Sequence, residues 1–285
     1  MSPSEFIYTV LLRPRPLRKL ANAALRAVLP IEASVHGAKI ALNPDDPVVS
    51  GALALGVYER EEIAFFQKYI RPEMNVVDVG ANVGLYTGMA LAVPGFSGSI
   101  LCVEPDARSR SFLEKTISLN RTKGNPQSVT VCPCAASDQA GTVSFYRNPE
   151  NHGDNRLYPD PALEAAGQVT TETLSALCAK NGITKIDFLK IDVQGGEGRA
   201  ISGAQEILAA SPKVILMSEF WPHGLKRCGS DPQDYLAMLN SLGFVLHDSS
   251  GRALNGAERT SLISQTSGRR YVNIFGFKGQ QARID

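Results

Sequence analysis

The residues most able to do chemistry in this chain stand in one short run, from Val76 to Gly84. An apolar stretch that contains Asp78 leads into a turn with glycines at positions 80 and 84, and an apolar, helix-compatible segment follows. That order predicts a buried strand, a tight loop and the first turn of a helix. Such a junction presents backbone N–H groups to a ligand. The run therefore predicts a small-molecule site at the end of the strand.

The spacing within this run favours one class of ligand. The dinucleotide fingerprint needs glycines at relative positions 0, 2 and 5, whereas Gly80 and Gly84 stand at positions 0 and 4. The carboxylate of Asp78 would repel a pyrophosphate but suits an ammonium group. S-adenosylmethionine carries an α-amino group and a sulfonium and has no phosphate. We therefore expect S-adenosylmethionine as the cofactor.

A second carboxylate stands where a bound nucleoside presents its ribose. The predicted strand 99–104 ends in Glu104-Pro105, about 20 residues past the glycine turn, and an acid at that place accepts hydrogen bonds from ribose hydroxyls. The alternative is an acid that only complements the dipole of the following helix. We favour the ribose because the position of Glu104 agrees with the first motif.

Strands and helices alternate along the rest of the chain. We expect strands at 75–80, 99–104, 129–136, 186–193 and 214–220, and helices at 59–70, 106–120, 170–181 and 198–210. This alternation predicts a mostly parallel sheet with helices on both faces. A helix that begins after Asp231 precedes two last strands, 244–248 and 271–277. The loop 249–270 joins them without a helix, so they should be antiparallel to each other. Residues 142–147 add a short extra strand.

Composition excludes some partners. The 285 residues are 44% apolar and 20% charged with a net charge of +1, so no bulk charge favours nucleic acid. The five cysteines have no zinc spacing. Cys132 and Cys134 lie in a predicted strand at positions that share one face, and we interpret them as buried thiols of a cytoplasmic protein. Metal or redox use of these thiols is the alternative.

The N-terminal segment differs from the rest in charge. Residues 1–30 hold five Arg or Lys against one acid, Glu5. We expect residues 1–37 to be a helical extension, ahead of a catalytic domain over 38–285, that packs on this domain or on a second subunit of a homo-oligomer. Attachment to a membrane surface is the alternative. The apolar stretch 6–12 is too short to cross a bilayer and precedes the basic residues, unlike a signal peptide.

A second chemical segment covers residues 186–197, Ile-Asp-Phe-Leu-Lys-Ile-Asp-Val-Gln-Gly-Gly-Glu. Asp187, Lys190 and Asp192 interrupt an otherwise apolar strand, which is costly unless these charges are paired or functional. Lys190 and Asp192 are two residues apart, so both side chains project to one face of the strand and can pair. The fourth strand of a doubly wound sheet ends beside the ligand site. We expect both residues there.

With further segments in the same order, this run resembles the FkbM family of S-adenosylmethionine-dependent methyltransferases. The matching segments are Gly56-Val57-Tyr58-Glu59, Asp78 to Gly84, Val103-Glu104-Pro105, Ala135-Ala136-Ser137-Asp138, 186–197 and Ser218-Glu219-Phe220. The resemblance runs from about residue 38 to about residue 248. It implies the Rossmann-like α/β fold of class I methyltransferases, a seven-stranded, mostly parallel sheet whose last strand is antiparallel. It also implies O-methylation of a hydroxyl on a small-molecule acceptor, such as a sugar, a glycolipid or a natural product.

The resemblance also implies roles for single residues. The implied cofactor-binding residues are Asp78, Gly80, Asn82 and Gly84 for the methionine part, Glu104 with Pro105 for the ribose, Ala136, Ser137 and Asp138 for the adenine, and Tyr58 with Glu59. Lys190 and Asp192 would stand nearest the transferring methyl and the acceptor. The alternative for Glu59 is a plain first-turn acid of its helix. The family commonly has an acid where this chain has Gln194, and this departure weakens any metal site.

Methyl transfer to a hydroxyl needs an aligned acceptor and a base for its proton. Asp192 is the first candidate base, and His223 and His152 are the alternatives. His223 follows the fifth strand, and His152 lies in a polar loop over residues 148–160 that can cover the site. A divalent cation between Asp192, Glu219 and a histidine would activate the hydroxyl instead. No ligand spacing supports it, so we expect no metal.

Three other functions remain as alternatives. The first is N-methylation on the same fold, which is disfavoured because no Asn-Pro-Pro-Tyr-type segment follows the fourth strand. The second is a nicotinamide-dependent oxidoreductase, which the glycine spacing disfavours. The third is a non-catalytic partner that binds the cofactor without turnover.

Overall fold

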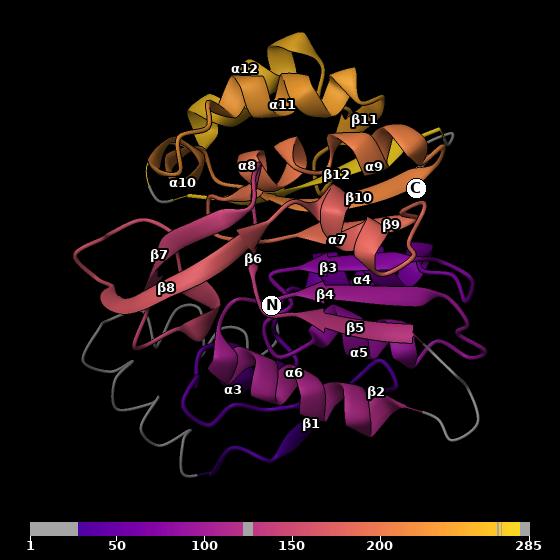
Figure 1. Ribbon diagram of the computed structural model, residues 1–285, viewed down its shortest axis with the longest axis vertical. Coiled ribbons are helices and arrows are strands. Elements are labelled where there is room, and N and C mark those ends of the chain that lie inside the picture. Colours follow the sequence, from indigo (N-terminus) through magenta and orange to yellow (C-terminus); the bar gives the residue numbers. More distant parts are fainter. Residues whose placement is uncertain (1–27, 122–127, 267, 269, 280–285) are drawn as a thin grey trace.

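A computed structural model describes residues 28–121, 128–266, 268 and 270–279 of the chain. At its centre lies a seven-stranded sheet in the order β11-β12-β10-β9-β3-β4-β5 (Figure 1). The strands are β3 (Val76–Val79), β4 (Ser99–Val103), β5 (Ser128–Cys132), β9 (Phe188–Ile191), β10 (Val214–Phe220), β11 (Phe244–His247) and β12 (Val272–Lys278). β12 runs antiparallel to both neighbours, and the other pairs are parallel. This confirms the class I methyltransferase architecture.

Helices cover both faces of this sheet, because its strands are apolar on both sides. Val76 and Phe188 belong to one core, whereas the next residues, Val77 and Leu189, belong to the other. The first core includes residues of α3 (Val49–Ala54), α4 (Arg60–Tyr69), α5 (Leu85–Leu91), α6 (Ala107–Asn120), β1 (Glu32–Val35) and β2 (Ala38–Ala41). The second includes residues of α7 (Leu174–Lys180), α8 (Glu197–Ser202), α9 (Gln205–Ala210), α10 (Pro222–Arg227) and α11 (Pro232–Ser241).

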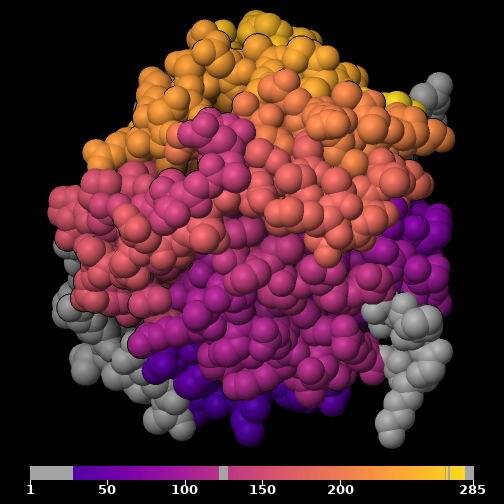
Figure 2. All heavy atoms as spheres, in the orientation of Figure 1, coloured from indigo at the N-terminus to yellow at the C-terminus, as the bar shows by residue number. Residues whose placement is uncertain are grey.

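A smaller sheet lies beside the carboxyl ends of β3, β4 and β5 (Figure 1). It consists of β6 (Ala135–Ala136), β8 (Glu164–Glu172) and β7 (Gly141–Arg147) in that order, and β7 and β8 are antiparallel. The expected extra strand at 142–147 is therefore confirmed as β7. In the space-filling view this sheet forms one side of a continuous body, between the N-terminal segments in indigo and the C-terminal segments in yellow (Figure 2).

Four expected elements are corrected by the structure. The strand expected at 129–136 ends at Cys132, because Pro133 has no N–H for the ladder, and β6 joins the smaller sheet instead. Both Cys132 and Cys134 are nevertheless buried. The helix expected at 170–181 begins only at Leu174, after Thr173 caps the N–H of Ala176.

The last two corrections concern a break and an unexpected helix. The helix expected at 198–210 is divided into α8 and α9 at Gly203, where a Cβ would stand 2.0 Å from the carbonyl oxygen of Ser137. The loop expected at 249–270 contains α12 (Gly256–Gln265), whose sequence has no strong apolar stripe and none of whose residues is fully buried. Asp231 caps α11 as expected.

The expected N-terminal helix lies on residues 1–27, outside the described part of the chain. Within the described part, β1 pairs with β2 as a hairpin, so the expected boundary at residue 37 falls inside one structural unit. None of the helices formed by the described residues has the length and apolar character needed to cross a membrane.

The glycine after β3 gives a stability prediction. Gly80 has φ +73°, and a Cβ there would lie 1.9 Å from the carbonyl oxygen of Asp192. Gly80→Ala should lower the free energy of unfolding by about 3 kcal/mol or more, because the left-handed backbone and the backbone overlap both cost energy. Gly56→Ala is the control, since Gly56 has φ +66° with open space around it. It should cost only about 1–2 kcal/mol in urea denaturation, and equal losses would contradict the close contact.

Candidate functional site

The glycine turn after β3 is tied to the end of β4. The N–H groups of Gly80 and Ala81 both donate to the carbonyl of Val103, at 2.8 and 3.2 Å. Asn82 takes a left-handed conformation with φ +48°, and Gly84, also left-handed, is the N-cap of α5. The turn thus leads directly from the strand into the helix, as the sequence predicted.

Glu104 is held in place by two backbone donors. Its Oε2 accepts from the N–H of Asn82 at 2.9 Å, and its Oε1 accepts from the N–H of Asp106 at 2.8 Å. The side chain is only 7% exposed, and its desolvation raises the pKa to about 7 despite these bonds. Each oxygen keeps a lone pair for a further donor. This carboxylate is therefore preset to accept hydrogen bonds from a ligand.

The ammonium of Lys190 lies directly under the glycine turn. Nζ donates to the carbonyl of Gly80 at 2.8 Å and to that of Val79 at 3.4 Å, and it lies 3.7 Å from Oδ1 of Asp78. Asp78 is fully buried and also accepts from the hydroxyl of Thr87. The ion pair of Lys190 is thus made with Asp78, and the pairing expected between Lys190 and Asp192 is wrong.

A cavity opens at the carboxyl ends of β3, β4 and β9. The residues of the sequence-predicted site that line it are Tyr58, Glu59, Gly80, Asn82, Glu104, Pro105, Ala136, Lys190 and Asp192. We call this space the first cavity.

The structure leaves four predicted cofactor residues outside the lining of the first cavity. Asp78 is buried behind the turn, and Gly84 packs against Leu113 in α6. Ser137 donates to Asp138, whose carboxylate faces Arg199. Their neighbours Val83, Leu85 and Ala136 line the cavity in their place. Most of the predicted residues therefore line one cavity, but not every residue of the motifs faces it.

The polar loop over residues 148–160, which was predicted to cover the site and to carry the candidate base His152, supplies further lining residues. His152, Gly153, Asn155 and Leu157 all face the first cavity. His152 is 5% exposed, desolvation lowers its pKa, and Asn43 donates to its Nδ1 at 3.1 Å. The histidine is therefore a neutral, fixed part of the wall. The sequence signal that predicted the loop was its polar composition, which does not show which side chain turns inward.

A second cavity adjoins the first on the side of β10. The two share Val49, Tyr58, Glu59, Gly153, Asp192 and Gln194 as a common wall. The second cavity is further lined by the carboxylates of Glu62, Asp154 and Glu219 and by the rings of Trp221 and Tyr271. The guanidinium carbon of Arg156 lies 4.7 Å from the ring centre of Trp221, so the covering loop is packed against the end of β10. Sequence reasoning did not place Glu62, Arg156 or Tyr271 at the site.

The candidate bases differ in where they lie. Asp192 lines both cavities, whereas His152 lines only the first. His223 is exposed on α10 and lines neither of them, with its ring 5.6 Å from that of Trp221. The expectation that His223 faces the site is therefore wrong. The residue follows β10 as predicted, but the first turn of α10 carries its side chain outward.

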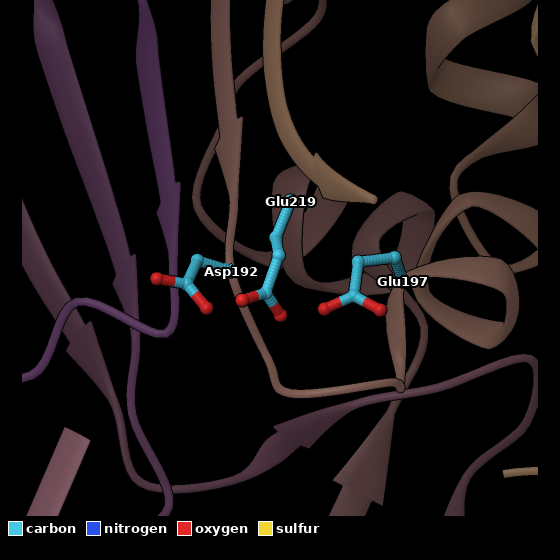
Figure 3. A group of neighbouring side chains, drawn as sticks. All are labelled: Asp192, Glu197 and Glu219. Carbon is cyan, nitrogen blue, oxygen red and sulfur yellow. The ribbon is translucent and has the colours of Figure 1, made fainter. Parts of the chain in front are cut away.

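Three carboxylates gather beside the common wall (Figure 3). One oxygen from each of Asp192, Glu197 and Glu219 lies within 4.8 Å of the others. Burial, with the charge of Asp192 adding to it, raises the pKa of Glu219 well above its ordinary value and that of Glu197 to about 7. Glu197 accepts from the N–H groups of Val193 and Gly195.

Comparison with known proteins agrees with this geometry. The model of the Methyltransferase FkbM domain matches residues 78–246, more than half of the chain. The chain belongs to this family. A 2-O-methyltransferase named NoeI from Sinorhizobium fredii is 24% identical over 155 residues, which cover 48% of this chain and 60% of that protein. The methyltransferase sdnD from Sordaria araneosa is 24% identical over 181 residues, covering 53% of this FkbM protein and 68% of the relative.

The solved structures that match this chain have low sequence identity to it. An FkbM methyltransferase from Methylobacillus flagellatus is 14% identical, with a TM-score of 0.42, covering 92% of this chain and 59% of that one. A structure described as a putative O-methyltransferase, from Klebsiella pneumoniae, is 12% identical with a TM-score of 0.43, covering 96% of each chain.

The electrostatics of the common wall predict a pH-dependent stability effect at Glu59. Its carboxylate accepts from the hydroxyl of Tyr86 at 2.6 Å, and desolvation and the charge of Asp192 raise its pKa to about 7. An acid whose pKa is raised in the folded state destabilises that state above about pH 7, and the cost fades as pH falls toward the unfolded value. Glu59→Gln should therefore raise the free energy of unfolding at pH 8 by on the order of 1–2 kcal/mol.

This gain should shrink as pH falls below about 7 and disappear only near pH 4, below the ordinary carboxyl pKa of 4.5, where the carboxyl is protonated in the unfolded chain as well. Urea denaturation at both pH values measures it. Glu61→Gln is the matched control, because Glu61 is exposed on the same first turn of α4. A Glu59→Gln variant with the same stability as wild type at pH 8 would contradict the assigned charge burial.

Proposed function

We propose that this FkbM-family protein transfers the methyl group of S-adenosylmethionine to a hydroxyl of a small, sugar-like acceptor. The observation that carries this proposal is the common wall of the two cavities. A cofactor in the first cavity and an acceptor in the second would meet at Glu59, Asp192 and Gln194. In-line displacement needs this arrangement, because the acceptor oxygen must approach the methyl carbon from the side opposite the sulfur.

The charges of the first cavity support S-adenosylmethionine over a phosphorylated cofactor. Glu59, Glu104 and Asp192 supply negative charge for the ammonium and the sulfonium. Lys190 is the only Lys or Arg among the described lining residues, and its ammonium is taken up by backbone carbonyls. A pyrophosphate in the first cavity would therefore be repelled by these carboxylates, and no unpaired cation among the described lining residues would bind it. Glu104 is oriented for the ribose, and the apolar Ala136, Phe145 and Leu157 suit the adenine.

The second cavity supports a neutral, hydroxyl-rich acceptor. Its amide and carboxylate groups can bind hydroxyls, and the rings of Trp221 and Tyr271 offer flat apolar surfaces. Glu62 and Glu219 disfavour a phosphorylated or sulfated acceptor, because like charges repel, and the one arginine among the described lining residues, Arg156, is already paired with Asp154 and Asp160. The printed activity of NoeI, a 2-O-methyltransferase, is in keeping with an oxygen acceptor.

In the proposed mechanism Asp192 takes the proton that the acceptor hydroxyl loses. It is the one candidate base of the three that lines both cavities. Lys190 holds the glycine turn through Val79 and Gly80 and supplies positive charge close to the carboxylate. The cofactor supplies the activated methyl, so the protein's part is alignment and proton removal. No metal is included in this proposal.

Cofactor affinity should depend on Glu104. Glu104→Ala should weaken binding of S-adenosylhomocysteine by about 1.5–3 kcal/mol, because it removes charge-assisted hydrogen bonds to the ribose. Isothermal titration calorimetry measures this change. Glu206→Ala is the control, since Glu206 is exposed on α9. Unchanged affinity in the Glu104 variant would refute the placement of the cofactor.

Turnover should depend on Asp192 more than binding does. An acceptor is first identified by incubating the protein with methyl-labelled cofactor and a panel of sugars, glycolipids and natural-product alcohols. Asp192→Asn keeps the shape of the side chain and should lower kcat by about 10²–10⁴-fold, the range for loss of a general base. S-adenosylhomocysteine affinity should change far less.

His223→Ala is the matched control for this experiment, since His223 lies outside both cavities. It should keep the turnover of the wild type. Near-normal turnover of Asp192→Asn would exclude Asp192 as the base, and a labelled amine as the only product would exclude O-methylation.

A further inference from the structure

Gln194 links the two carboxylates of the common wall. Its Nε2 donates to Oδ1 of Asp192 at 2.8 Å and to both carboxylate oxygens of Glu219, at 3.1 and 3.2 Å. Ionised carboxylates only accept hydrogen bonds, so the NH₂ end of the amide must face them. Gln194 lines both cavities as well. A single neutral side chain therefore lies where the proposed cofactor and acceptor sites meet.

The backbone around Gln194 fixes the direction of this side chain. Gln194 has φ +54°, a left-handed conformation that is unfavourable for a residue with a side chain. Glu197 holds the turn by accepting from the N–H groups of Val193 and Gly195. Gly195 leaves room for the backbone of α10, because a Cβ there would lie 2.5 Å from the carbonyl of Gly224. The strained conformation is thus imposed from both sides.

The charges around Gln194 show why a donor is needed there. When both are ionised, Asp192 and Glu219 repel each other at this distance, and because Glu219 is only 3% exposed, water does little to relieve the repulsion and the pKa of Glu219 is raised. The ammonium of Lys190 is directed to the carbonyls of Val79 and Gly80, and the guanidinium of Arg156, which lines the second cavity, is paired with Asp154 and Asp160. A hard divalent cation between carboxylates is one way to relieve such repulsion. Two N–H groups of one amide are another.

We propose that Gln194 is a positioning residue whose amide holds Asp192 and Glu219 together and replaces a divalent cation between them. The part played by Asp192 rests on the proposed function, whereas the replacement of a cation does not. The amide keeps the carboxylate of Asp192 directed at the acceptor without a metal.

The direct test converts the amide into an acid. Gln194→Glu adds a fourth carboxylate to Asp192, Glu197 and Glu219 and removes the amide donor between them. The result is a set of oxygen ligands that suits Mn²⁺. Electron paramagnetic resonance counts the free Mn²⁺. We expect the Gln194→Glu variant to bind Mn²⁺ at least about 10-fold more tightly than the wild type, since added carboxylate ligands raise the affinity of such sites. Gln194→Leu, which removes the donor without adding charge, should not gain this affinity.

A charge-swap variant separates positioning from a general structural role. Gln194→Leu should lower kcat by about 10- to 100-fold, the effect of losing charge-assisted hydrogen bonds, with little change in S-adenosylhomocysteine affinity. The double variant Gln194→Glu/Glu219→Gln exchanges amide and acid across the same hydrogen bond. It should bind Mn²⁺ no better than the wild type. Without added metal, Gln194→Glu should lose kcat because its amide donor is gone, and the double variant should recover most of that loss.

Several results would contradict the role proposed for Gln194. Wild-type turnover that is abolished by EDTA and restored by Mg²⁺ would overturn it, as would a Gln194→Glu variant without added Mn²⁺ affinity. A swap variant with no recovery would overturn the positioning role. If Asp192→Asn keeps normal turnover while the Mn²⁺ results hold, the assignment of the base fails and the replacement of a cation stands.

Discussion

The two cavities depend on one close contact between the ends of β3 and β9. The turn at Gly80 touches the carbonyl of Asp192 so closely that no side chain fits between them. Lys190 ties the same two strands by donating to the carbonyls of Val79 and Gly80. Because of this contact, the glycine turn and Asp192 lie against one another at the centre of the sheet. The first and second cavities can then share a wall.

The wall is electrostatically costly for the folded protein. Burial raises the pKa of Glu59, Glu104, Glu197 and Glu219, which means that the folded state disfavours their ionised forms. The described part of the chain has four non-glycine residues with positive φ. Three of them, Glu59, Asn82 and Gln194, line the first cavity, and two of these also line the second. Strain and buried charge concentrate where ligand binding can relieve them. The ammonium and sulfonium of S-adenosylmethionine would bring two positive charges to this place.

The sequence allowed the fold to be predicted, and most of the residues proposed for the site line one cavity, because both follow from local patterns. Strand, turn and helix around Gly80, and the acid at Glu104, are encoded by residues close together in the chain. The elements that were predicted wrongly have two different causes. Gly203 divides a helix because the carbonyl of Ser137 lies against it, and α12 has too weak an apolar pattern to be recognised. Side-chain direction was the least predictable property. Lys190 and Asp192 were expected on one face of a strand, but β9 ends at Ile191 and the lysine pairs with Asp78, its neighbour on β3 in the sheet.

The central claim is that the first cavity holds the cofactor and the common wall is the place of methyl transfer. A crystal structure of the protein with S-adenosylhomocysteine tests it most directly. We predict that the ribose hydroxyls bind the carboxylate of Glu104 and that the sulfur lies next to the wall formed by Tyr58, Glu59, Asp192 and Gln194. The site of the missing methyl should then face the second cavity. A cofactor bound outside the first cavity, or one whose sulfur is turned away from the common wall, would contradict the account.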